Sequence, residues 1–508
     1  MGKIRVVGER FLLAMLFIGI LAYESFGIAT PGMWWDEAST ISAATRDWRS
    51  FFHLINLIDA VHAVYYVCLH YWIQLFGQSA FVLRLPSAIA VTFGCWFTYL
   101  LGKRLRGSAL GVLAAVLLAI LPRASWAATE ARSYGFSLAL AAASSLAFVI
   151  ASQATASGAG DVAAVKKWRV YRYAAIASNY VFLYSLLVTI SHGVSLFAAG
   201  PSKRQDFKAW ARSFWIIVVS SLPILVYGSI QNGQIGWIDW KLANIADLWF
   251  KQNFLHNESF AEYGWSILIL ALLVHWVVVR RRSPLLALTL SWWLFPTLLL
   301  IAYSVILKPI YNPRYLAMAA PAVALLLAWS MATLATFAKT VLQRIGLKRV
   351  SWLGNLVVGA LLVLAMSLST ASYLDQRQPE ANNTDWVDVS KDIAAESKPG
   401  DAVLWADNGR TVPTLSRIAI AYPESFRNLA EVTTRKPFFE TKQLYADRFH
   451  ISDVLDRIVT HKRVFLLGMQ AGETKSFRTI SRLLAEQQYV AVQGWTWTHS
   501  RGTLFVRR

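Results

Sequence analysis

Two adjacent carboxylates stand beside two tryptophans near the beginning of the chain, in the segment Trp34-Trp35-Asp36-Glu37. The segment follows an apolar run that begins at Phe11. A carboxylate at the edge of an apolar region can have a raised pKa and can accept a proton from a hydroxyl group. Neighbouring helical residues point in different directions, so we expect only one of the two carboxylates to reach a reacting group. The simpler alternative is an aromatic belt beside a solvated loop acid.

Cations recur at comparable places, next to the ends of apolar runs. Arg84 opens the segment RLPSA, Arg123 and Arg132 flank a short polar loop, and Lys308 and Arg314 precede a later apolar run. Each one alone is explained as a long side chain anchored at a membrane interface. Together they indicate a site for an anionic group such as a lipid phosphate. Arg314 is the first candidate for that contact, and Lys308 is the next.

The loop 232–262 combines amides, glycines and tryptophans, including Gln234 and Trp237. Aromatic rings stack on sugars and amides hydrogen-bond to them, so the loop predicts a sugar or polar-head pocket. A turn with interfacial tryptophans is the alternative.

His192 interrupts a pair of apolar runs. A structural hydrogen bond is the ordinary role of a histidine at such a place, and a contact with a cavity is the alternative. The sequence contains no phosphate-binding loop, dinucleotide fingerprint, nucleophile elbow or cysteine-rich metal motif.

The elements that must position these residues are apolar helices. Hydrophobic residues make up 56% of the 508 positions and charged residues only 15%, compared with about 25% in soluble domains. Lipid is therefore the predicted solvent of most of the chain. Stretches long enough to cross a membrane are predicted at 11–30, 82–101, 107–122, 133–151, 173–190, 191–200, 213–231, 263–279, 284–307, 315–337 and 352–373. The aromatic stretch 62–76 is shorter, and we expect an interfacial helix there.

The net charge of +20 is concentrated in loops on one side of this pattern. The basic residues are Lys103, Arg104, Arg106, Lys166, Lys167, Arg169, Arg172, Lys203, Arg204, Lys208, Arg212, Arg280, Arg281, Arg282, Lys339, Arg344, Lys348 and Arg349. Eleven spans with a cytoplasmic N-terminus place all of them inside, as the positive-inside tendency requires. The charge therefore needs no nucleic acid, and we expect a multi-pass protein of the inner or plasma membrane. An uncleaved first span is favoured over a signal peptide because no small-residue cleavage site follows it.

The last part of the chain, 374–508, is more polar and contains alternating helix and strand patterns. Helices are predicted at 384–397, 411–421, 451–460 and 475–487, and strands at 402–406, 464–468, 489–496 and 503–507. We expect a transmembrane domain over 1–373 and a small α/β domain over 374–508. In the eleven-span arrangement this second domain is extracytoplasmic.

The order of these motifs resembles a known family. The acidic pair after the first span, the segment Leu83-Arg84-Leu85-Pro86-Ser87-Ala88, the group Glu130-Ala131-Arg132-Ser133-Tyr134 and the group Pro313-Arg314-Tyr315-Leu316 are similar to those of integral-membrane glycosyltransferases with the GT-C fold. The resemblance covers most of residues 1–340. It is nearest to dolichyl-phosphate-mannose protein mannosyltransferases and related bacterial enzymes of glycosyltransferase families 39 and 83.

This resemblance implies an inverting hexosyltransferase, an enzyme of class EC 2.4. Such an enzyme moves a sugar from a polyprenyl-phosphate donor to a glycan, glycolipid or protein acceptor at the outer membrane face. Asp36, with Glu37 beside it, matches the family's catalytic base, and Arg314 matches a residue that holds the lipid phosphate. Lys308, Arg132 and Arg84 are further candidates for that phosphate. Substrate contacts are expected from Tyr65, Tyr66, Glu130, Tyr134, His192, Gln234, Trp237 and Tyr315.

One segment departs from the family pattern. Relatives often have His-Pro-Pro-Leu-Tyr-Tyr in the interfacial stretch, whereas this chain has His62-Ala63-Val64-Tyr65-Tyr66, which puts the local backbone and any sugar contact there in doubt. The variant resembles actinobacterial members, which implies mannose as the sugar. No metal is demanded, although some relatives use a divalent cation between the acid and the phosphate.

Two other classes of protein remain open from the sequence. A transporter or flippase of a lipid-linked precursor would also have many spans and cations for a phosphate. That class predicts inverted repeats and ionisable residues at mid-bilayer, and the sequence shows no repeat at a fixed period. A non-catalytic envelope scaffold is the third reading, and it leaves the placement of Asp36, Glu37 and Arg314 unexplained.

Overall fold

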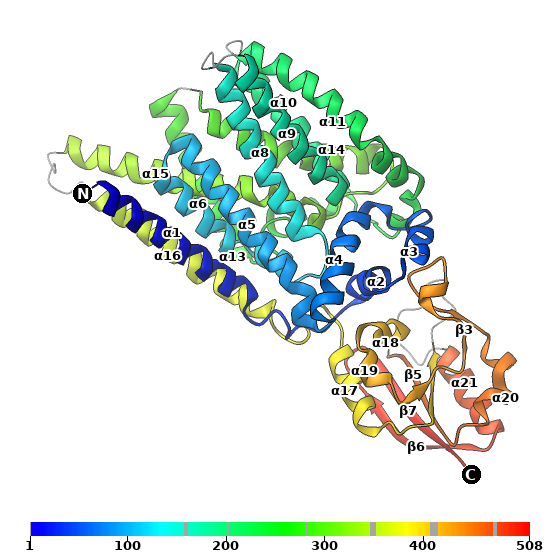
Figure 1. Ribbon diagram of the computed structural model, residues 1–508. Coiled ribbons are helices and arrows are strands. Elements are labelled where there is room, and N and C mark those ends of the chain that lie inside the picture. The colour runs from blue at the N-terminus through cyan, green and yellow to red at the C-terminus, as the bar shows by residue number, and fades with distance from the viewer. Residues whose placement is uncertain are drawn as a thin grey trace. The chain divides into compact units, whose positions relative to one another are not determined.

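The computed structural model describes residues 2–156, 161–200, 203–280, 282–345, 352–406, 415–470 and 475–508. The chain forms two compact units (Figure 1). The first unit comprises Met1–Ile28, Ala60–Tyr65 and Arg84–Asp375, and the second comprises Ala29–Asp59, Tyr66–Leu83 and Gln376–Arg508. Most of the loop predicted at 31–81 therefore belongs to the same unit as the tail. The domain boundary predicted between residues 373 and 374, which separates a transmembrane domain from an α/β domain, stays a prediction.

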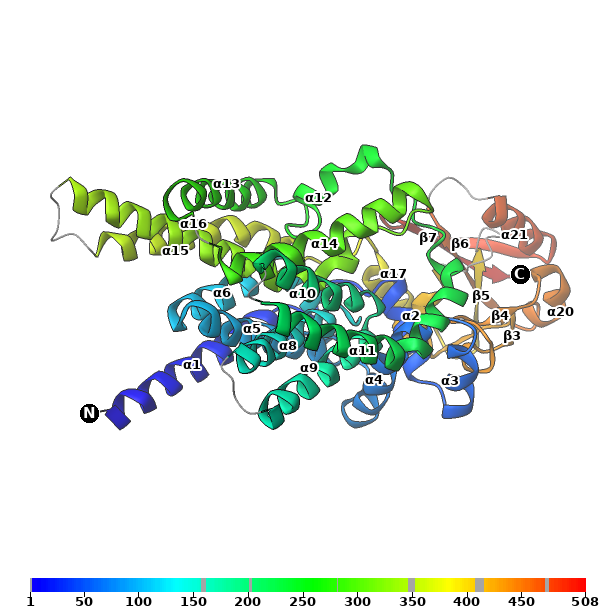
Figure 2. The same cartoon turned by 90° about the horizontal axis from the view of Figure 1, so that it is seen from above.

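The first unit is built of helices that run side by side (Figures 1 and 2). Its long helices are α1 (Gly2–Ser25), α5 (Ala80–Arg106), α6 (Ser108–Ile120), α8 (Tyr134–Ala156), α9 (Asp161–Val181), α10 (Leu186–Ala199), α11 (Arg204–Ile230), α13 (Glu258–Val274), α14 (Pro284–Ile306), α15 (Ala320–Arg344) and α16 (Leu353–Asp375). Short elements connect them: η1 (Ala60–His62), α7 (Pro122–Ala128), η2 (Leu183–Ser185), η4 (Asn232–Ile235), η5 (Leu242–Asn244), α12 (Ala246–Phe250), the π-helix η6 (His275–Val279) and η7 (Pro313–Ala319).

Each of the eleven apolar stretches predicted from the sequence overlaps one of the long helices. Among the described residues, seven helices are long and apolar enough to cross a membrane, or eight if the bent pair α6 and α7 forms one span. The predicted fold class, an all-helical polytopic domain with a small α/β domain after it, is confirmed. Of the basic residues assigned to one side, Arg281, Lys348 and Arg349 lie outside the described residues.

The predicted limits of two helices are wrong. The stretches 173–190 and 191–200 were separated at His192, but the chain breaks earlier, at Phe182, between α9 and α10. The first half of α9 was not predicted because the charged residues at 166–172 lower its hydropathy, although they are part of the helix. Their long side chains can extend to water while the backbone stays helical. His192 is therefore inside α10 and not at a helix break.

Helix α15 lies at the centre of the first unit. Its alanines and leucines from Ala320 to Met331 are buried without interruption, and it packs against α6, α13, α14 and α16. Pro321 stands in the first turn, where proline costs no backbone hydrogen bond. Small residues allow close packing elsewhere as well: a Cβ atom on Gly111 of α6 would lie 2.4 Å from the carbonyl oxygen of Tyr99 on α5.

The second unit contains the first-loop helices α2 (Trp35–Ala44) and α3 (Trp48–Ile55), most of α4 (Ala63–Phe76), and the tail. The helix predicted at 62–76 is present as α4. The tail contains α17 (Trp386–Glu396), β1 (Asp401–Ala406), η9 (Leu415–Arg417), α18 (Ile418–Ala421), α19 (Pro423–Phe426), β2 (Leu429–Ala430), β3 (Thr434–Lys436), η10 (Phe438–Glu440), β4 (Asp447–Arg448), η11 (Ile451–Val454), α20 (Leu455–Ile458), β5 (Arg463–Met469), α21 (Lys475–Glu486), β6 (Tyr489–Thr496) and β7 (Ser500–Arg507).

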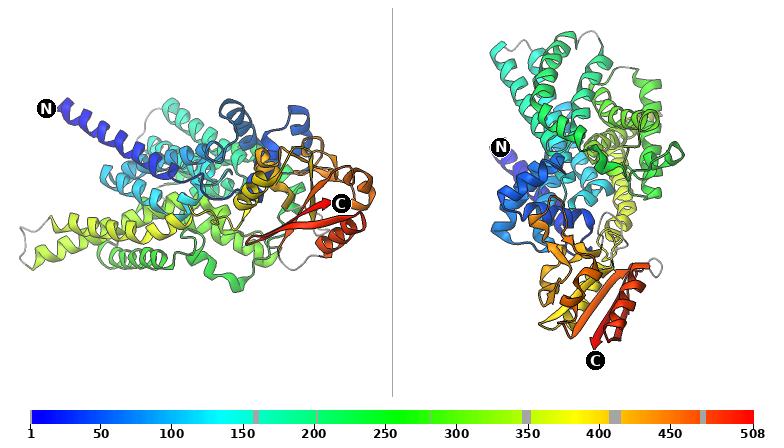
Figure 3. Two further views of the ribbon diagram at one scale, coloured as in Figure 1. Left: turned by 90° about the horizontal axis from the view of Figure 1, so that it is seen from below. Right: turned by 90° about the vertical axis from the view of Figure 1, so that its right-hand side faces the viewer.

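The tail has a five-stranded mixed sheet with the order β2-β1-β5-β7-β6. The β1–β2 and β1–β5 pairs are parallel, and β7 pairs antiparallel with β5 and β6. Helix α21 lies along this sheet (Figure 3), and Phe477, Ile480 and Leu484 on one of its faces are buried. The predicted strands and most predicted helices of the tail are present. The exception is 411–421, where residues 411–414 lie outside the described residues and the remainder forms η9 and α18.

Candidate active site

Asp36 and Glu37 stand in the first turn of α2, in the second unit. The positive end of a helix dipole stabilises carboxylates at this position. The side chain of Glu37 is buried, with 1% of its surface exposed, whereas Asp36 is half-buried. Of the two acids, Asp36 is therefore the one that a substrate can reach.

The tail holds the segment that carries these acids. Arg417 of η9 donates to the carbonyl oxygen of Trp35 (3.3 Å) and to the hydroxyl of Ser39 (3.1 Å). The backbone N–H of Met33 donates to the hydroxyl of Tyr422 at 2.8 Å. These three hydrogen bonds join residues 378 to 389 positions apart, so periodicity and local motifs in the sequence could not reveal them.

For the transfer reaction predicted from the sequence, replacing Arg417 with glutamine is expected to lower turnover and leave the apparent affinity for the donor unchanged. The two hydrogen bonds that fix the start of α2 are lost, each contributing about 1 kcal/mol, and the Asp36 carboxylate is held less firmly. Steady-state kinetics with varied donor separate kcat from KM. Lysine at 417 retains one donor and should restore part of kcat. A change confined to the donor KM would contradict this positioning role.

In the first unit, Arg132 and His62 form a buried hydrogen-bonded group with Ser133. A nitrogen of the Arg132 guanidinium lies 3.1 Å from Nε2 of His62, and Nδ1 of His62 lies 3.2 Å from the Ser133 hydroxyl. A guanidinium only donates hydrogen bonds, so Nε2 is the acceptor and the proton of the neutral ring is on Nδ1. Burial, followed by the charges of Arg132 and Arg314, holds the pKa of His62 well below its usual range. His62 therefore stays neutral beside two cations.

Arg314 begins η7, where the side chain of Asn312 accepts a hydrogen bond from the Arg314 backbone N–H (3.2 Å). Its guanidinium lies over the indole ring of Trp237, 5.1 Å from the centroid, and 5.6 Å from that of Tyr315. Aromatic faces hold a guanidinium in a fixed plane. Tyr315 is itself packed beside Tyr184 at 5.7 Å.

The loop after α11 is attached to the segment that carries His62. The side-chain oxygen of Gln231 accepts hydrogen bonds from the backbone N–H of Ala60 (2.9 Å) and from the amide of Gln234 (3.3 Å). Two of the residues predicted from this loop, Gln234 and Trp237, therefore belong to the same region as Arg132 and Arg314. Trp237 is mostly exposed, so its ring can contact a ligand on the face opposite Arg314.

Several other predicted residues lie inside the helix packing. Arg84 is buried and donates to the carbonyl oxygen of Ile28 at 2.7 Å. Glu130 is buried beside Arg132, and its backbone carbonyl accepts from the Ser87 hydroxyl at 2.6 Å. Arg84 and Glu130 therefore support the Arg132 region from within. Their predicted contacts with substrate stay predictions.

The predicted aromatic residues have packing partners of their own. Tyr134 is buried between Trp126 and Phe182, with ring centroids at 5.0 and 6.0 Å. Tyr65 is buried against Phe136. In the second unit, Tyr66 donates its hydroxyl proton to Asp59 at 2.8 Å.

His192 and Lys308 differ from the residues around Arg314. His192 is enclosed in the helix bundle, where it hydrogen-bonds the hydroxyls of Ser145 and Tyr171, both at 3.0 Å, and stacks on Phe148. This is the ordinary structural role, and the predicted cavity contact has no support from these partners. Lys308 is half-exposed and makes no hydrogen bond or ion pair with another described residue.

The structure gives definite partners to His62, for which the sequence predicted no role, and to Arg123, which was predicted only as one of several cations near an anionic group. The place of His62 between Arg132 and Ser133 depends on contacts about 70 residues away. Arg123 donates to the carbonyl oxygens of Gln252 (2.7 Å) and Lys251 (2.6 Å), so it fixes the far end of loop 232–262.

A divalent cation was left open by the sequence. Asp36 and Glu37 supply two carboxylates, but in the part of the chain that the structure describes no group of three His, Cys, Asp or Glu side chains is arranged to hold a metal ion. Asp36 and Glu37 are therefore not part of a metal-ligand set among the described residues.

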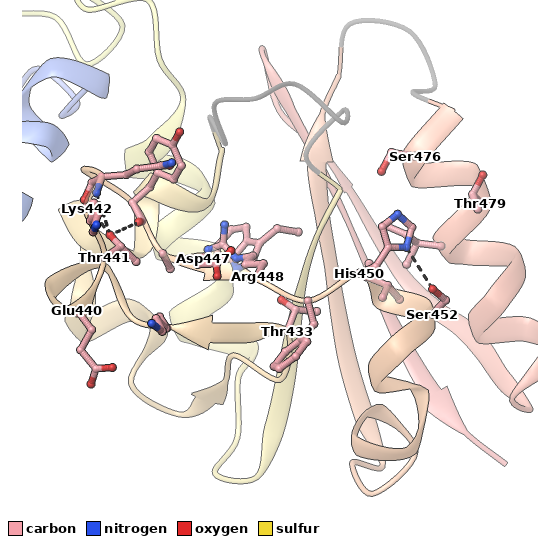
Figure 4. A pocket seen from close by; sticks show the side chains of 18 of the residues that line it. Thr433, Glu440, Thr441, Lys442, Asp447, Arg448, His450, Ser452, Ser476 and Thr479 are labelled. Atoms are coloured by element: carbon pink, nitrogen blue, oxygen red, sulfur yellow. Dashed lines mark hydrogen bonds between the residues drawn. The ribbon is translucent and has the colours of Figure 1, made fainter. Parts of the chain in front are cut away.

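The second unit also contains a cavity of about 1170 Å³ between the 433–452 segment and α21 (Figure 4). Lys442 and Thr441 lie on one side, and His450, Ser452 and Thr479 lie on the other. The lining includes four cations (Lys436, Lys442, Arg448 and Lys475), two carboxylates (Glu440 and Asp447) and the rings of Trp405, Tyr445 and Phe449. A cavity with aromatic walls and many hydroxyl and cationic donors suits a polyhydroxylated ligand.

Two buried polar groups of this cavity have no hydrogen-bond partner among the described residues. They are the indole N–H of Trp405, a residue that is 5% exposed, and the hydroxyl of Thr433, which is 2% exposed. Leaving a buried polar group unsatisfied costs about 1–3 kcal/mol. A ligand that enters the cavity and hydrogen-bonds them would recover that free energy.

The helical arrangement of the first unit, together with the α/β tail, has the predicted GT-C fold. Over almost its whole length the chain resembles crystal structures of ArnT from Cupriavidus metallidurans. The apo structure covers 98% of both chains at 12% sequence identity with a TM-score of 0.60. The structure bound to undecaprenyl phosphate covers 97% of this chain and 98% of that one at 11% identity, with a TM-score of 0.55.

A more distant likeness is to the apo oligosaccharyltransferase of Archaeoglobus fulgidus, at 11% identity over 96% of this chain and 74% of that one. Its TM-score of 0.47 is too low to add to the argument. No protein-family model and no curated protein sequence matches the chain. At these identities the comparisons show the fold and leave the reaction to be argued from the site.

Proposed function

We propose that the protein is an inverting glycosyltransferase that moves a sugar from a polyprenyl-phosphate donor to an envelope acceptor at the outer face of the membrane. The observation that carries the proposal is a pair of arginines beside a neutral histidine, the buried Arg132 and the half-buried Arg314 near His62. Guanidinium groups held at fixed positions suit an anionic group such as a lipid phosphate. The undecaprenyl phosphate bound to ArnT, a protein of the same fold, supports a lipid phosphate as that ligand.

The reaction is a single displacement at the anomeric carbon. The acceptor hydroxyl oxygen forms the new bond to that carbon, and the bond from the carbon to the phosphate oxygen breaks, leaving its electron pair on the lipid phosphate. Fixed cations stabilise charge that develops on a leaving group, and Arg314 and Arg132 have this role. Asp36 takes the proton of the hydroxyl as general base. One displacement inverts the configuration of the sugar.

The finer features of the proposal rest on the sequence. The sugar is mannose, and the acceptor is a glycan, glycolipid or protein of the cell envelope. Residues 1–373 form the transfer domain with a cytoplasmic N-terminus, and residues 374–508 form an extracytoplasmic domain. The basic residues at one set of helix ends favour this orientation.

Sugar transfer with purified protein tests the proposal. Synthetic polyprenyl-phosphate mannose and an envelope glycan acceptor are incubated with the reconstituted protein. Release of polyprenyl phosphate and formation of a glycoside of inverted configuration are the expected results. Movement of the intact donor across the vesicle bilayer without any transfer would instead favour a flippase. Transfer of other sugars with mannose refused would overturn only the sugar assignment.

We further propose that the cavity of the tail binds the acceptor. Its aromatic and cationic lining suits a sugar chain, and two of its lining residues, Trp405 and Thr433, have polar groups without a hydrogen-bond partner among the described residues. The sequence left open whether the tail binds an acceptor, covers a cavity or orients a partner. The cavity favours the first of these roles.

Replacing Trp405 with phenylalanine and Thr433 with valine is expected to raise the acceptor KM about tenfold. Each change removes one ligand hydrogen bond, worth about 0.5–1.5 kcal/mol, and leaves the donor KM unchanged. Because neither group has a hydrogen-bond partner among the described residues, the melting temperature should not fall. Trp497→Phe is the matched control: it removes the indole N–H bonded to Asp392 at 2.8 Å, so it should lower stability and leave the acceptor KM unchanged. The reverse pattern would contradict an acceptor site.

A further inference from the structure

A second cavity lies in the first unit, at the end of the helices opposite to Arg314. It has a volume of about 490 Å³ and is lined by the last turns of α5 and α15, by η6 and by the beginning of α14. Helix α15 starts directly after η7 and ends at Arg344, and its 25 residues span roughly 37 Å. That length is sufficient to cross a bilayer, so the cavity and the Arg314 region belong to opposite membrane faces.

Four arginines from different parts of the chain line the cavity. Arg104 and Arg106 come from α5, Arg282 precedes α14, and Arg344 ends α15. Their partners are neutral: Arg104 donates to Gln153 (2.7 Å), Arg106 to Thr333 (3.3 Å) and Arg282 to the carbonyl oxygen of Ala199 (3.4 Å). No acidic residue lines the cavity, and none of the four arginines forms an ion pair with a carboxylate among the described residues.

The remaining lining is apolar and extends to the outside of the bundle. Trp329 forms a buried wall and is in edge contact with His275 at 5.5 Å. Val278, Phe337 and Val341 line the same cavity and are exposed on the surface of the helices. The cavity is therefore cationic at the helix ends and apolar along the helices, which is the distribution that a phosphate-bearing lipid presents to a protein.

The wall formed by η6 has an uncommon backbone. Residues His275–Val279 form a π-helix that ends α13, and Arg280 closes it with a left-handed conformation (φ 52°). π-Helical turns are rare and occur frequently at functional sites.

The positive-inside tendency explains why basic residues gather at this end of the helices, but it requires only that they lie on one side. The exposed basic residues Lys166, Lys167 and Arg169 satisfy it from a single helix, α9. By contrast, the cavity brings together arginines separated by more than 200 residues. The positive-inside tendency therefore does not explain why these arginines line one cavity with apolar walls.

We propose that this cavity binds the headgroup phosphate of an anionic phospholipid in the leaflet opposite to the sugar-transfer site, with its acyl chains along Val278, Phe337 and Val341. Basic pockets between transmembrane helices bind anionic headgroups in this way. The site is separate from the donor site, so the inference stands whether or not the protein transfers a sugar.

Lipid binding by the reconstituted full chain tests the proposal. Affinity for phosphatidylglycerol is measured in nanodiscs of phosphatidylcholine, and retained lipids are identified by native mass spectrometry. The variant Arg104→Gln/Arg282→Gln/Arg344→Gln is compared with Lys166→Gln/Lys167→Gln/Arg169→Gln, which removes the same charge from the same side. We expect the cavity variant to lose about tenfold or more in phosphatidylglycerol affinity and the control variant to lose less than about threefold.

Three results would overturn the proposal. Equal losses in the two variants would show diffuse attraction between a basic face and an anionic membrane. Competition by inorganic phosphate or glycerol phosphate at millimolar concentration would show a site for a soluble anion. Equal retention of phosphatidylcholine and phosphatidylglycerol by the unchanged protein would show no headgroup selection. If the triple variant fails to fold, Arg282→Gln alone serves, because its one hydrogen bond is to a single carbonyl at 3.4 Å.

Discussion

Replacing Asp36 with asparagine is expected to lower the kcat of sugar transfer about 10²–10⁴-fold, because the reaction loses its general base. Asparagine has nearly the shape of aspartate, so membrane insertion, the melting temperature and donor binding should stay close to those of the unchanged protein. Transfer from synthetic polyprenyl-phosphate mannose, measured under single-turnover conditions, separates the chemical step from donor binding.

The two adjacent acids should behave differently. Glu37 is buried in the first turn of α2, whereas Asp36 is half-buried and accessible. Glu37→Gln is therefore expected to lower stability more than turnover, and Asp36→Asn the reverse.

A matched control is present one helix later in the same loop. Asp47 caps α3 by accepting a hydrogen bond from the Ser50 backbone N–H at 2.9 Å. Asparagine is as good a helix cap as aspartate, so Asp47→Asn should preserve both folding and turnover. If Asp36→Asn retained full turnover, or if Asp47→Asn lost as much, Asp36 would not be the base.

The architecture was predictable because its signals are local. Runs of apolar residues long enough for a membrane indicate helices whatever their neighbours are, and each such run overlaps a helix in the structure. Local strand patterns predicted the tail strands in the same way. The error at α9 arose because hydropathy assigns charged residues to loops, although the basic residues at 166–172 continue the helix.

The contacts of the candidate site were not predictable for the opposite reason. Residue types pointed to Asp36 and Arg314, but the partners of each lie far away in the sequence. Arg417 reaches α2 across more than 370 residues, and Arg132 reaches His62 across 70. Single-sequence patterns carry no information about such pairs. The sequence also does not show which polar residues are buried. His192 could contact a cavity according to the sequence, but in the structure its ring nitrogens are hydrogen-bonded to Ser145 and Tyr171.

Replacing Arg314 with glutamine is expected to raise the donor KM about 30-fold or more. A hydrogen bond to a charged group contributes about 1.5–3 kcal/mol, and 2 kcal/mol corresponds to about 30-fold. Lysine at this position keeps the charge but loses the planar group that lies over Trp237 and Tyr315, so Arg314→Lys should have an intermediate effect. Donor titration at saturating acceptor measures both changes.

Inhibition by the product identifies the group that Arg314 contacts. Polyprenyl phosphate has the phosphate of the donor but not its sugar, so Arg314→Gln should weaken its inhibition by the same factor as it raises the donor KM. Lys241→Gln is the matched control, since it removes an exposed cation from the same loop as Trp237 and should change neither value. If the donor KM rose while product inhibition stayed constant, Arg314 would contact the sugar and the phosphate would be held by other cations. Because His62 is neutral, Arg132 is the cation beside Arg314 that would then have to hold it.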